Sequence, residues 1–283
     1  MTNISTIINK VGAHLRVVFG RGLPIFLLLI IFFVAGGGIS QHERWRIEQV
    51  QVTGARAVPF DEIVRATDVI LGGNNYFVYS RKNSRLFPQK DVEKGVLMQF
   101  PRLATVKATR DSAHSITVAV TERKPFALWC GLVAVKSMSP CWYLDETGFI
   151  FDSAPIFSDG AYLQLYGFLD EEDALEPLCK IVPRAEFENI RTFIGELRAH
   201  GIEPSRVALS EDGAMSINIH ASSAYRVLVG VELRFNKEQD SVVLAKNLLA
   251  ALPVQFPVNG PQQKKLEYID LRFGNKVFFG FEN

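Results

Sequence analysis

The longest uniform stretch of the chain is apolar and lies near its N-terminus. Residues 22–40, GLPIFLLLIIFFVAGGGIS, contain no charged side chain. A helix of this length would extend about 28 Å, close to the ~30 Å hydrocarbon layer of a membrane. The pattern therefore predicts a transmembrane helix over residues 22–40, preceded by a short tail over residues 1–21.

The charges on either side of this helix indicate its orientation. Lys10, Arg16 and Arg21 precede it without any acidic residue, whereas Arg44 and Arg46 follow it among glutamates. The small excess of basic residues favours a cytoplasmic N-terminus, and a long folded region is translocated largely regardless of its charge. We expect a single-pass protein whose N-terminus is cytoplasmic and whose remaining residues lie outside the cytoplasm.

A cleaved signal peptide is the alternative to a retained anchor. The most hydrophobic part, Leu23–Val34, has a length typical of a signal-peptide core, and small residues follow it. The segment before it is long, however, and no clean A-x-A cleavage site follows, which favours the anchor. Both interpretations place the rest of the chain outside the cytoplasm.

Between residues 45 and 123 the hydrophobic pattern becomes short and regular. IEQVQVTG predicts a strand that ends at Gly54, and VPFDEIVRAT predicts a short helix that begins at Pro59. A second helix is expected over residues 88–100, because an apolar stripe runs up to Pro101. ATVKATR and ITVAVTER alternate apolar and polar residues and predict a hairpin. One β-α-α-β-β domain is therefore expected over residues 45–123.

Residues 124–283 are dominated by strand-like patterns. YLDETGFIF predicts two strands and a turn, and ALSEDGAMSINIH and YRVLVGVEL predict further strands. AEFENIRTFIGELRAHG and DSVVLAKNLLAALP carry apolar residues at helical spacing. The chain closes on LEYIDLRFGNKVFFGFEN, which predicts two strands rich in aromatic residues. The expected fold class is α+β: a transmembrane helix, a β-α-α-β-β domain, and a strand-rich β-domain with flanking helices over residues 124–283.

Charge and motif content argue against an enzyme or a nucleic-acid-binding protein. Lys plus Arg is 31 and Asp plus Glu is 30, so the net charge of +1 provides no field that attracts phosphates. The five histidines are scattered, and no nucleophile elbow, zinc-protease helix or phosphate-binding loop occurs. We therefore expect neither a cofactor nor a small-molecule substrate, and a non-enzymatic binding protein remains.

Two acidic groups are weighed as catalytic or metal sites. The run Asp170–Asp173 is interpreted as a solvated loop and not as a metal site, because no histidine or further carboxylate cluster recurs at ligand spacing. Asp145, Glu146 and Asp152 are candidate carboxylates for glycan hydrolysis, but they surround a turn, where acids are common.

The three cysteines allow one disulfide. Outside the cytoplasm Cys130 and Cys141 could pair and close a short loop, which would stabilise the fold by roughly 2 to 3 kcal/mol. Three free buried thiols are the alternative, because the odd count leaves Cys179 without a partner in either case.

Several of these motifs together resemble the FtsQ/DivIB family of bacterial cell-division proteins. They are the single membrane span, the turn Val52–Gly54, the step Phe100–Arg102, the closing VTERKP, the hairpin YLDETGFIF, and IDLRF followed by a Gly-Phe ending. Ala55 and the loop DSAHS depart from the family pattern, which affects local turns only. The resemblance implies a POTRA domain over residues 45–123, a β-domain beyond it, and a place in the inner membrane at the division septum.

The resemblance also implies where partners bind. In this family the C-terminal strands of the β-domain bind FtsB, a small bitopic protein that pairs with FtsL. The matching positions here are Phe273, Gly274, Asn275, Lys276 and Phe281.

A last strand at a sheet edge leaves backbone groups free, so a partner could add a strand there. In that arrangement Leu271 and Phe273 are expected to point into the core, while Arg272 and Lys276 face the partner. The alternative is that the closing aromatic residues only complete the core. Two other functions stay open: a POTRA-containing component of a secretion or outer-membrane assembly system, and a membrane-anchored cell-wall hydrolase.

Overall fold

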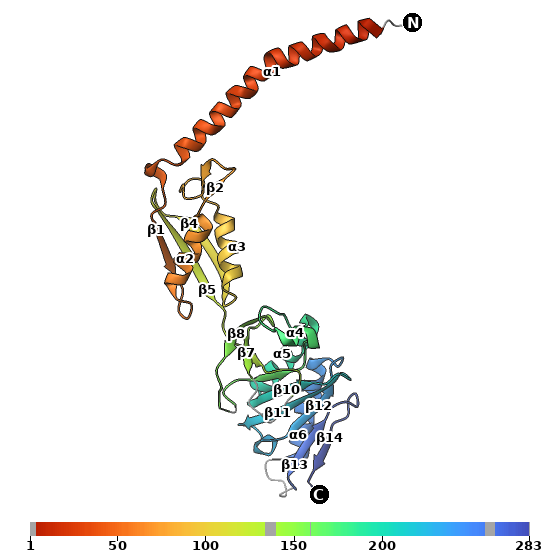
Figure 1. Cartoon of the computed structure of the whole chain (residues 1–283). Coiled ribbons are helices and arrows are strands. Elements are labelled where there is room, and N and C mark those ends of the chain that lie inside the picture. The colour runs from red at the N-terminus through yellow and green to blue at the C-terminus, as the bar shows by residue number, and fades with distance from the viewer. Residues whose placement is uncertain (1–3, 134–139, 159, 258–263, 283) are drawn as a thin grey trace. The chain divides into compact units, whose positions relative to one another are not determined.

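The chain folds into two compact units, Met1–Glu122 and Arg123–Asn283. In this computed structural model, residues 4–133, 140–158, 160–257 and 264–282 are described. An N-terminal helix is followed by strand-rich sheets and a few helices (Figure 1). The predicted α+β class is therefore confirmed.

The first unit begins with the long helix α1, Ile4–Ser40. Its part Gly22–Ser40 is long and apolar enough to cross a membrane, and most of the side chains in this part are exposed. The helical backbone extends back to Ile4, through the segment for which the sequence suggested only a short tail.

The rest of the first unit is a three-stranded sheet with two helices packed against it. Its elements are η1 Glu43–Trp45, β1 Gln49–Thr53, α2 Phe60–Leu71, β2 Asn74–Asn75, β3 Tyr79–Ser80, α3 Gln89–Gln99, β4 Leu103–Arg110 and β5 Ser115–Glu122. The sheet order is β1-β5-β4, with β1 parallel and β4 antiparallel to β5. Ile63 of α2, Val92 of α3 and Val118 of β5 meet in its core. The β-α-α-β-β order is as expected, but the short β2–β3 hairpin was not predicted.

The turn after β1 fits closely against β5. Gly54 has φ +89°, a left-handed conformation that favours glycine. A Cβ atom at Gly54 would lie 2.1 Å from the carbonyl oxygen of Val120. Only glycine therefore fits where the end of β1 meets β5, which explains the glycine of the turn Val52–Gly54.

The glutamate of the VTERKP motif holds the segment that follows this turn. Glu122 Oε1 accepts hydrogen bonds from the backbone N–H groups of residues 56–58 at 2.7 to 3.0 Å. Burial on its own would raise the pKa of Glu122, but these bonds and the charge of Arg102 outweigh it and hold the pKa below its ordinary value. The carboxylate thus ties the last strand of the unit to the start of α2.

Replacing this carboxylate should weaken the first unit in a pH-dependent way. Glu122→Gln should lower the free energy of unfolding by about 1 to 2 kcal/mol near neutral pH, because three N–H groups lose a charged acceptor. The folded-state pKa lies below the ordinary 4.5, so this stabilisation is present above that pH and disappears as the pH falls through the folded-state pKa. Thermal unfolding of both chains at about pH 7 and about pH 3.5 checks this, since the difference between them should shrink with acid. An unchanged difference would contradict the assignment.

The second unit begins with a residue that is anchored in its own hairpin turn. Arg123 Nη1 lies 2.5 Å from Asp145 Oδ2, and its guanidinium lies 4.1 Å from the centroid of the Phe149 ring. Glu122 and Arg123 are thus consecutive residues fixed in different units. The TERKP motif therefore marks where the chain leaves one unit and enters the next.

A nine-stranded sheet forms the second unit. Its strands are β6 Ala127–Trp129, β7 Cys141–Leu144, β8 Ile150–Ala154, β9 Gln164–Tyr166, β10 Ile202–Leu209, β11 Ala214–Ser222, β12 Glu232–Asn236, β13 Leu266–Asp270 and β14 Phe278–Phe281. The order is β14-β13-β12-β11-β10-β9-β6-β7-β8, so β14 and β8 are the two ends. Helices α5, Arg184–Ala199, and α6, Ser241–Gln255, bury Phe193 and Leu248 in the same core as Leu233 and Ile269 of the sheet.

Two predicted elements of this unit were wrong in detail. The segment YRVLVGVEL is not one strand: Arg226–Leu228 form a 3-10 turn, Gly230 has φ +82°, and β12 begins only at Glu232. The acidic run is not a loop, because Asp170 caps a short helix, α4 Glu171–Leu175. Capping by an aspartate at a helix N-terminus explains the acids without a metal. Within the described ranges no cluster of three or more His, Cys, Asp or Glu residues could hold a metal ion.

Candidate partner-binding edge

Strand β14 forms one end of the nine-stranded sheet and has a single neighbour. It pairs antiparallel with β13, from Leu266 opposite Phe281 to Asp270 opposite Phe278. In the described part of the chain no other strand pairs with its outer edge (Figure 1). The N–H of Glu282 donates a hydrogen bond to the carbonyl of Lys265, on the β13 side of β14. Backbone N–H groups along a strand point alternately to its two sides, so the N–H groups of Phe279 and Phe281 point to the open edge. The end of the chain thus presents a strand edge.

The side chains of β14 divide between the two faces of the sheet. Val277, Phe279 and Phe281 pack against the hydrophobic core. The ring of Phe279 lies 5.6 Å from that of Phe256, just beyond α6, in an edge-to-face contact. Phe281 was predicted as a partner contact, but its half-buried side chain contributes to the core. Only its backbone is available at the edge.

Two exposed aromatic residues lie close together between the end of β13 and the start of β14. Phe273 is 56% exposed and Phe278 is 48% exposed, and their rings meet edge-to-face at 5.2 Å. Leu271 is buried as expected, but the prediction that Phe273 also points into the core was wrong. Strand alternation does not extend to Phe273, because β13 ends at Asp270. The two rings form an apolar anchor at the surface.

The turn between the two strands carries the other predicted contact residues. Gly274, Asn275 and Lys276 are all exposed. Gly274 has φ +66°, and its carbonyl accepts a hydrogen bond from the Asn247 side chain at 3.3 Å. Phe273, Gly274, Asn275 and Lys276 therefore lie together on one turn, whereas Phe281 lies at the far end of β14.

The charged residues of the IDLRF motif are paired with each other. Arg272 contacts both carboxylate oxygens of Asp270, with Nε at 2.9 Å from Oδ1 and Nη2 at 2.5 Å from Oδ2. Arg272 is the main reason that the pKa of the buried Asp270 lies below its usual range. Arg272 is exposed, as expected of a residue that faces a partner, and its charge also holds Asp270 at the end of β13.

Comparison with known proteins agrees with these motifs. No family model matches the chain. The chain is similar to the cell division protein FtsQ of Geobacter sp. (strain M21), with 25% identity over 245 residues that cover 84% of this chain and 77% of the relative. The chain is a distant homologue of FtsQ. The similarity agrees with the motifs of the FtsQ/DivIB resemblance, and the apolar helix Gly22–Ser40 fits a single-pass membrane protein.

Tyr268, which sequence reasoning missed, covers the outer face of the β13–β14 hairpin. A Cβ atom at Gly280 would lie 2.3 Å from the ring of Tyr268, on the neighbouring strand. The guanidinium of Arg234 lies 4.2 Å from the centroid of the same ring. The glycine of the Gly-Phe ending is thus needed because Tyr268 lies over β14 at that position. The available signal was a glycine inside a strand, which often marks a close approach.

Adding a side chain at Gly280 should disturb the edge. Gly280→Ala forces the Tyr268 ring to move, and we expect it to lower the free energy of unfolding by about 1 to 3 kcal/mol. In a Tyr268→Ala background the same substitution should cost much less, because the space is then free. Chemical unfolding of the four chains measures the coupling. Equal costs in both backgrounds would show that Tyr268 does not constrain this position.

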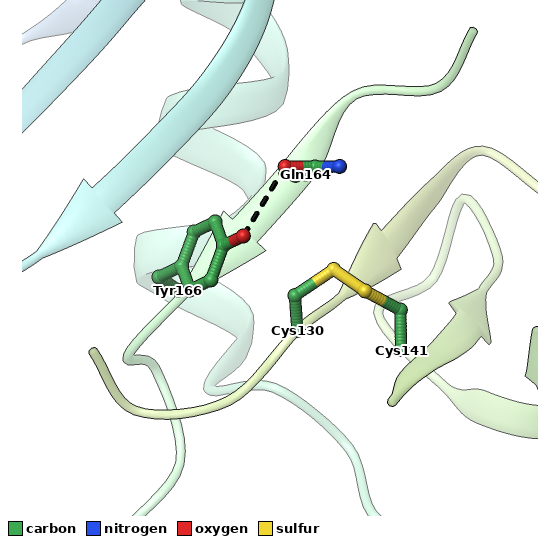
Figure 2. The surroundings of a disulfide bond; sticks show 4 residues. All are labelled: Cys130, Cys141, Gln164 and Tyr166. Atoms are coloured by element: carbon green, nitrogen blue, oxygen red, sulfur yellow. Dashed lines mark hydrogen bonds between the residues drawn. A yellow bond between two sulfur atoms is a disulfide. The ribbon is translucent and has the colours of Figure 1, made fainter. Parts of the chain in front are cut away.

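The disulfide expected as one alternative is present in the structure. Cys130 and Cys141 are bonded and join the end of β6 to the start of β7 (Figure 2). Cys130 is buried beside Tyr166, whose hydroxyl donates a hydrogen bond to Gln164 at 3.2 Å. Cys179 is exposed and carries a free thiol. The bond therefore closes the loop whose residues 134–139 lie outside the described ranges.

The carboxylates weighed as hydrolase residues have a structural role at Asp145. Its Oδ1 accepts hydrogen bonds from the N–H and hydroxyl of Thr147 and from the N–H of Phe149, and Arg123 binds its other oxygen. Burial on its own would raise the pKa of Asp145, but the bonds from Thr147 and Arg123 outweigh it and hold the pKa below its usual range. A general acid for glycan hydrolysis needs the opposite shift. Asp145 therefore has the contacts of a turn residue and not the raised pKa of a general acid.

Proposed function

We propose that this chain is a non-enzymatic scaffold of the bacterial division machinery, which holds a membrane partner by β-strand addition to β14. The observation that carries the proposal is the open edge of β14 beside the exposed Phe273–Phe278 pair. An added strand gains affinity from main-chain hydrogen bonds and specificity from side-chain contacts. The backbone of β14 and the aromatic pair supply these two parts.

The residues at the β14 edge indicate which conformation and side chains the partner segment has. It is extended, so that it can bond with the outward amides of Phe279 and Phe281. It carries an apolar side chain that covers the rings of Phe273 and Phe278, since exposed aromatic residues are frequent anchors of interfaces. The exposed Lys276 favours an acidic residue nearby. Small bitopic coiled-coil proteins of the FtsB and FtsL type are the proposed partners.

The remaining parts of the chain have supporting roles in this proposal. Residues 45–123 are assigned as a POTRA domain, on the β-α-α-β-β order and the parallel pairing of β1 with β5, and contribute to recruitment at the septum. The N-terminus is cytoplasmic and both folded units lie outside the cytoplasm. The Cys130–Cys141 disulfide supports this orientation, because such bonds persist in oxidising compartments.

Depletion in the native bacterium tests the function. Cells that lose the chain should grow into filaments without septa, and a fluorescent fusion to its N-terminus should gather at the division site. Expression of the intact chain from a second locus should restore septation. Normal division after depletion, or even fluorescence around the whole membrane in dividing cells, would overturn the proposal.

A further inference from the structure

The hairpin β2–β3 of the first unit carries two aromatic residues that its own fold does not use. Tyr76 and Phe77 form its tip and are 79% and 96% exposed. Both have a left-handed backbone, with φ of 49° and 68°, which is unfavourable for a bulky side chain. Neither side chain belongs to a hydrophobic cluster of the described residues. The tip therefore has two unfavourable features: a left-handed backbone at bulky residues, and aromatic side chains exposed to water.

Helix α1 passes close to this hairpin. The ring of Phe33 lies 5.1 Å from that of Tyr79 in an edge-to-face contact. Cβ atoms at Gly36 and Gly37 would lie 2.9 Å from the Tyr79 hydroxyl and 2.7 Å from Val78 Cβ. The small residues of the VAGGGIS segment thus let the helix backbone approach the hairpin.

Hydrogen bonds fix this contact at the end of the helix. Ser40 Oγ accepts a bond from the N–H of Ser80 at 3.1 Å, and the side chain of Asn83 donates to the carbonyl of Ser40 at 2.8 Å. Gln41 donates to the carbonyl of Val78 at 3.1 Å. The hairpin is therefore held against α1 along its last two turns.

For a membrane-spanning α1, the contact between α1 and the β2–β3 hairpin sets the depth of the hairpin. Phe33 and Ser40 are separated by roughly 10 Å along the helix axis. Because the apolar segment Gly22–Ser40 is about as long as the hydrocarbon layer is thick, a residue beside Phe33 lies below the membrane surface. Tyr79 lies there, and Tyr76 and Phe77 extend from the same short hairpin. The exposed aromatic tip thus belongs to a hairpin that packs against the apolar part of α1.

We propose that Tyr76 and Phe77 insert into the lipid leaflet next to Ser40 and hold the first unit against the bilayer. The partner of this surface is the membrane itself. Aromatic side chains are enriched at the membrane–water boundary, where an apolar ring and a polar group are both accommodated. Trp45, with the guanidinium of Arg85 at 3.6 Å from its ring centroid, lies five residues beyond Ser40 in sequence and suits the same boundary. The inference rests on α1 crossing a membrane and not on the proposed role of β14.

Fluorescence of the full chain in nanodiscs tests the insertion. With Cys179→Ser as background, Tyr76→Cys and, separately, Phe77→Cys are labelled with an environment-sensitive dye in phosphatidylethanolamine and phosphatidylglycerol. The Tyr76→Cys chain keeps Phe77, so one aromatic residue of the tip always remains. Phe60→Cys is the matched control, because Phe60 is 63% exposed at the other end of α2, roughly 16 Å from Leu71.

Dye at positions 76 and 77 should emit at shorter wavelength than dye at position 60. Its intensity should fall when lipids with a nitroxide near the carbonyl end of the acyl chain are included, and the control should not change. Emission typical of water at positions 76 and 77 would overturn the proposal. Blue-shifted emission without loss of intensity from the nitroxide lipid would also overturn it, because a protein surface and not lipid would then cover the tip.

Discussion

The chain with Gly54→Ala should lose about 3 kcal/mol of the stability of its first unit. Two causes act together. Alanine at φ +89° is disfavoured by about 1 to 2 kcal/mol, and its Cβ would lie 2.1 Å from the carbonyl oxygen of Val120. The second contact is with backbone that is itself part of the β1–β5 ladder, so β1 must shift away from β5. Because domains are stable by only 5 to 15 kcal/mol in general, this is a large loss.

Gly73→Ala is the matched control for this substitution. Gly73 has nearly the same conformation, φ +81°, but no atom lies within 4 Å of the Cβ position. It should therefore show only the conformational part of the cost, about 1 to 2 kcal/mol. The difference between the two variants isolates the contact with Val120.

Hydrogen exchange of the full chain in nanodiscs measures both variants. Amides of β5 should exchange roughly 100-fold faster in Gly54→Ala than in the unaltered chain, since each 1.4 kcal/mol is about tenfold. Amides of β11 belong to the second unit and should not change. Equal acceleration by Gly54→Ala and Gly73→Ala would show that the close approach to Val120 contributes nothing.

Replacing the exposed aromatic pair should remove most of the affinity for the partner. In Phe273→Ser with Phe278→Ser, the two exposed rings at the start of β14 are lost while the core-facing Val277, Phe279 and Phe281 are kept. Loss of central aromatic anchors typically costs 2 kcal/mol or more, so we expect at least a roughly 30-fold weaker complex. Affinity capture from gently solubilised membranes, followed by titration of the recovered partner, measures the change.

A second exposed apolar pair of the same unit provides the control. Val242 and Val243 lie at the start of α6 and are both exposed. Val242→Ser with Val243→Ser removes a smaller apolar surface of similar fractional exposure and should leave partner binding unchanged. Circular dichroism checks that both double variants fold. Similar binding by the two double variants would show that the aromatic pair is not the anchor.

The sequence predicted elements well where a single periodicity dominates. The alternating strands β4 and β5 and the stripes of α5 and α6 were all expected within a few residues of where they lie, and the apolar run Gly22–Ser40 is helical as expected, although α1 begins earlier, at Ile4. Each of these elements buries one continuous face, so its pattern repeats along the segment. The boundaries and the order of elements follow from that repeat.

The side chains of β14 that are buried could not be predicted in the same way. Both faces of this strand carry apolar side chains, from Val277, Phe278, Phe279 and Phe281. The alternation of side chains therefore does not indicate which face is buried. The packing of Phe279 against Phe256 decides it, and that contact joins β14 to the end of α6, with β13 between them in the chain. Phe273 lies beyond the end of β13, where strand alternation no longer applies.

Contacts between distant segments were also invisible in the pattern. Glu122 bonds to residues 56–58, more than sixty positions earlier, and no local signal marks such a partner. The hairpin β2–β3 has strands of only two residues, too short for a period to appear, and it is held by contacts with α1. Both features become clear only when the tertiary contacts are known.

Residue-resolved hydrogen exchange on β14 tests the central claim most directly. The full chain is measured in nanodiscs alone and with the purified extracytoplasmic segment of the FtsB-type protein of the same organism. Strand addition predicts that the outward amides of Phe279 and Phe281, which exchange quickly in the free chain, become strongly protected in the complex. The opposite sheet end, β8, should keep its exchange rates. Binding of the partner without protection at Phe279 and Phe281, or with protection at β8 instead, would contradict the account.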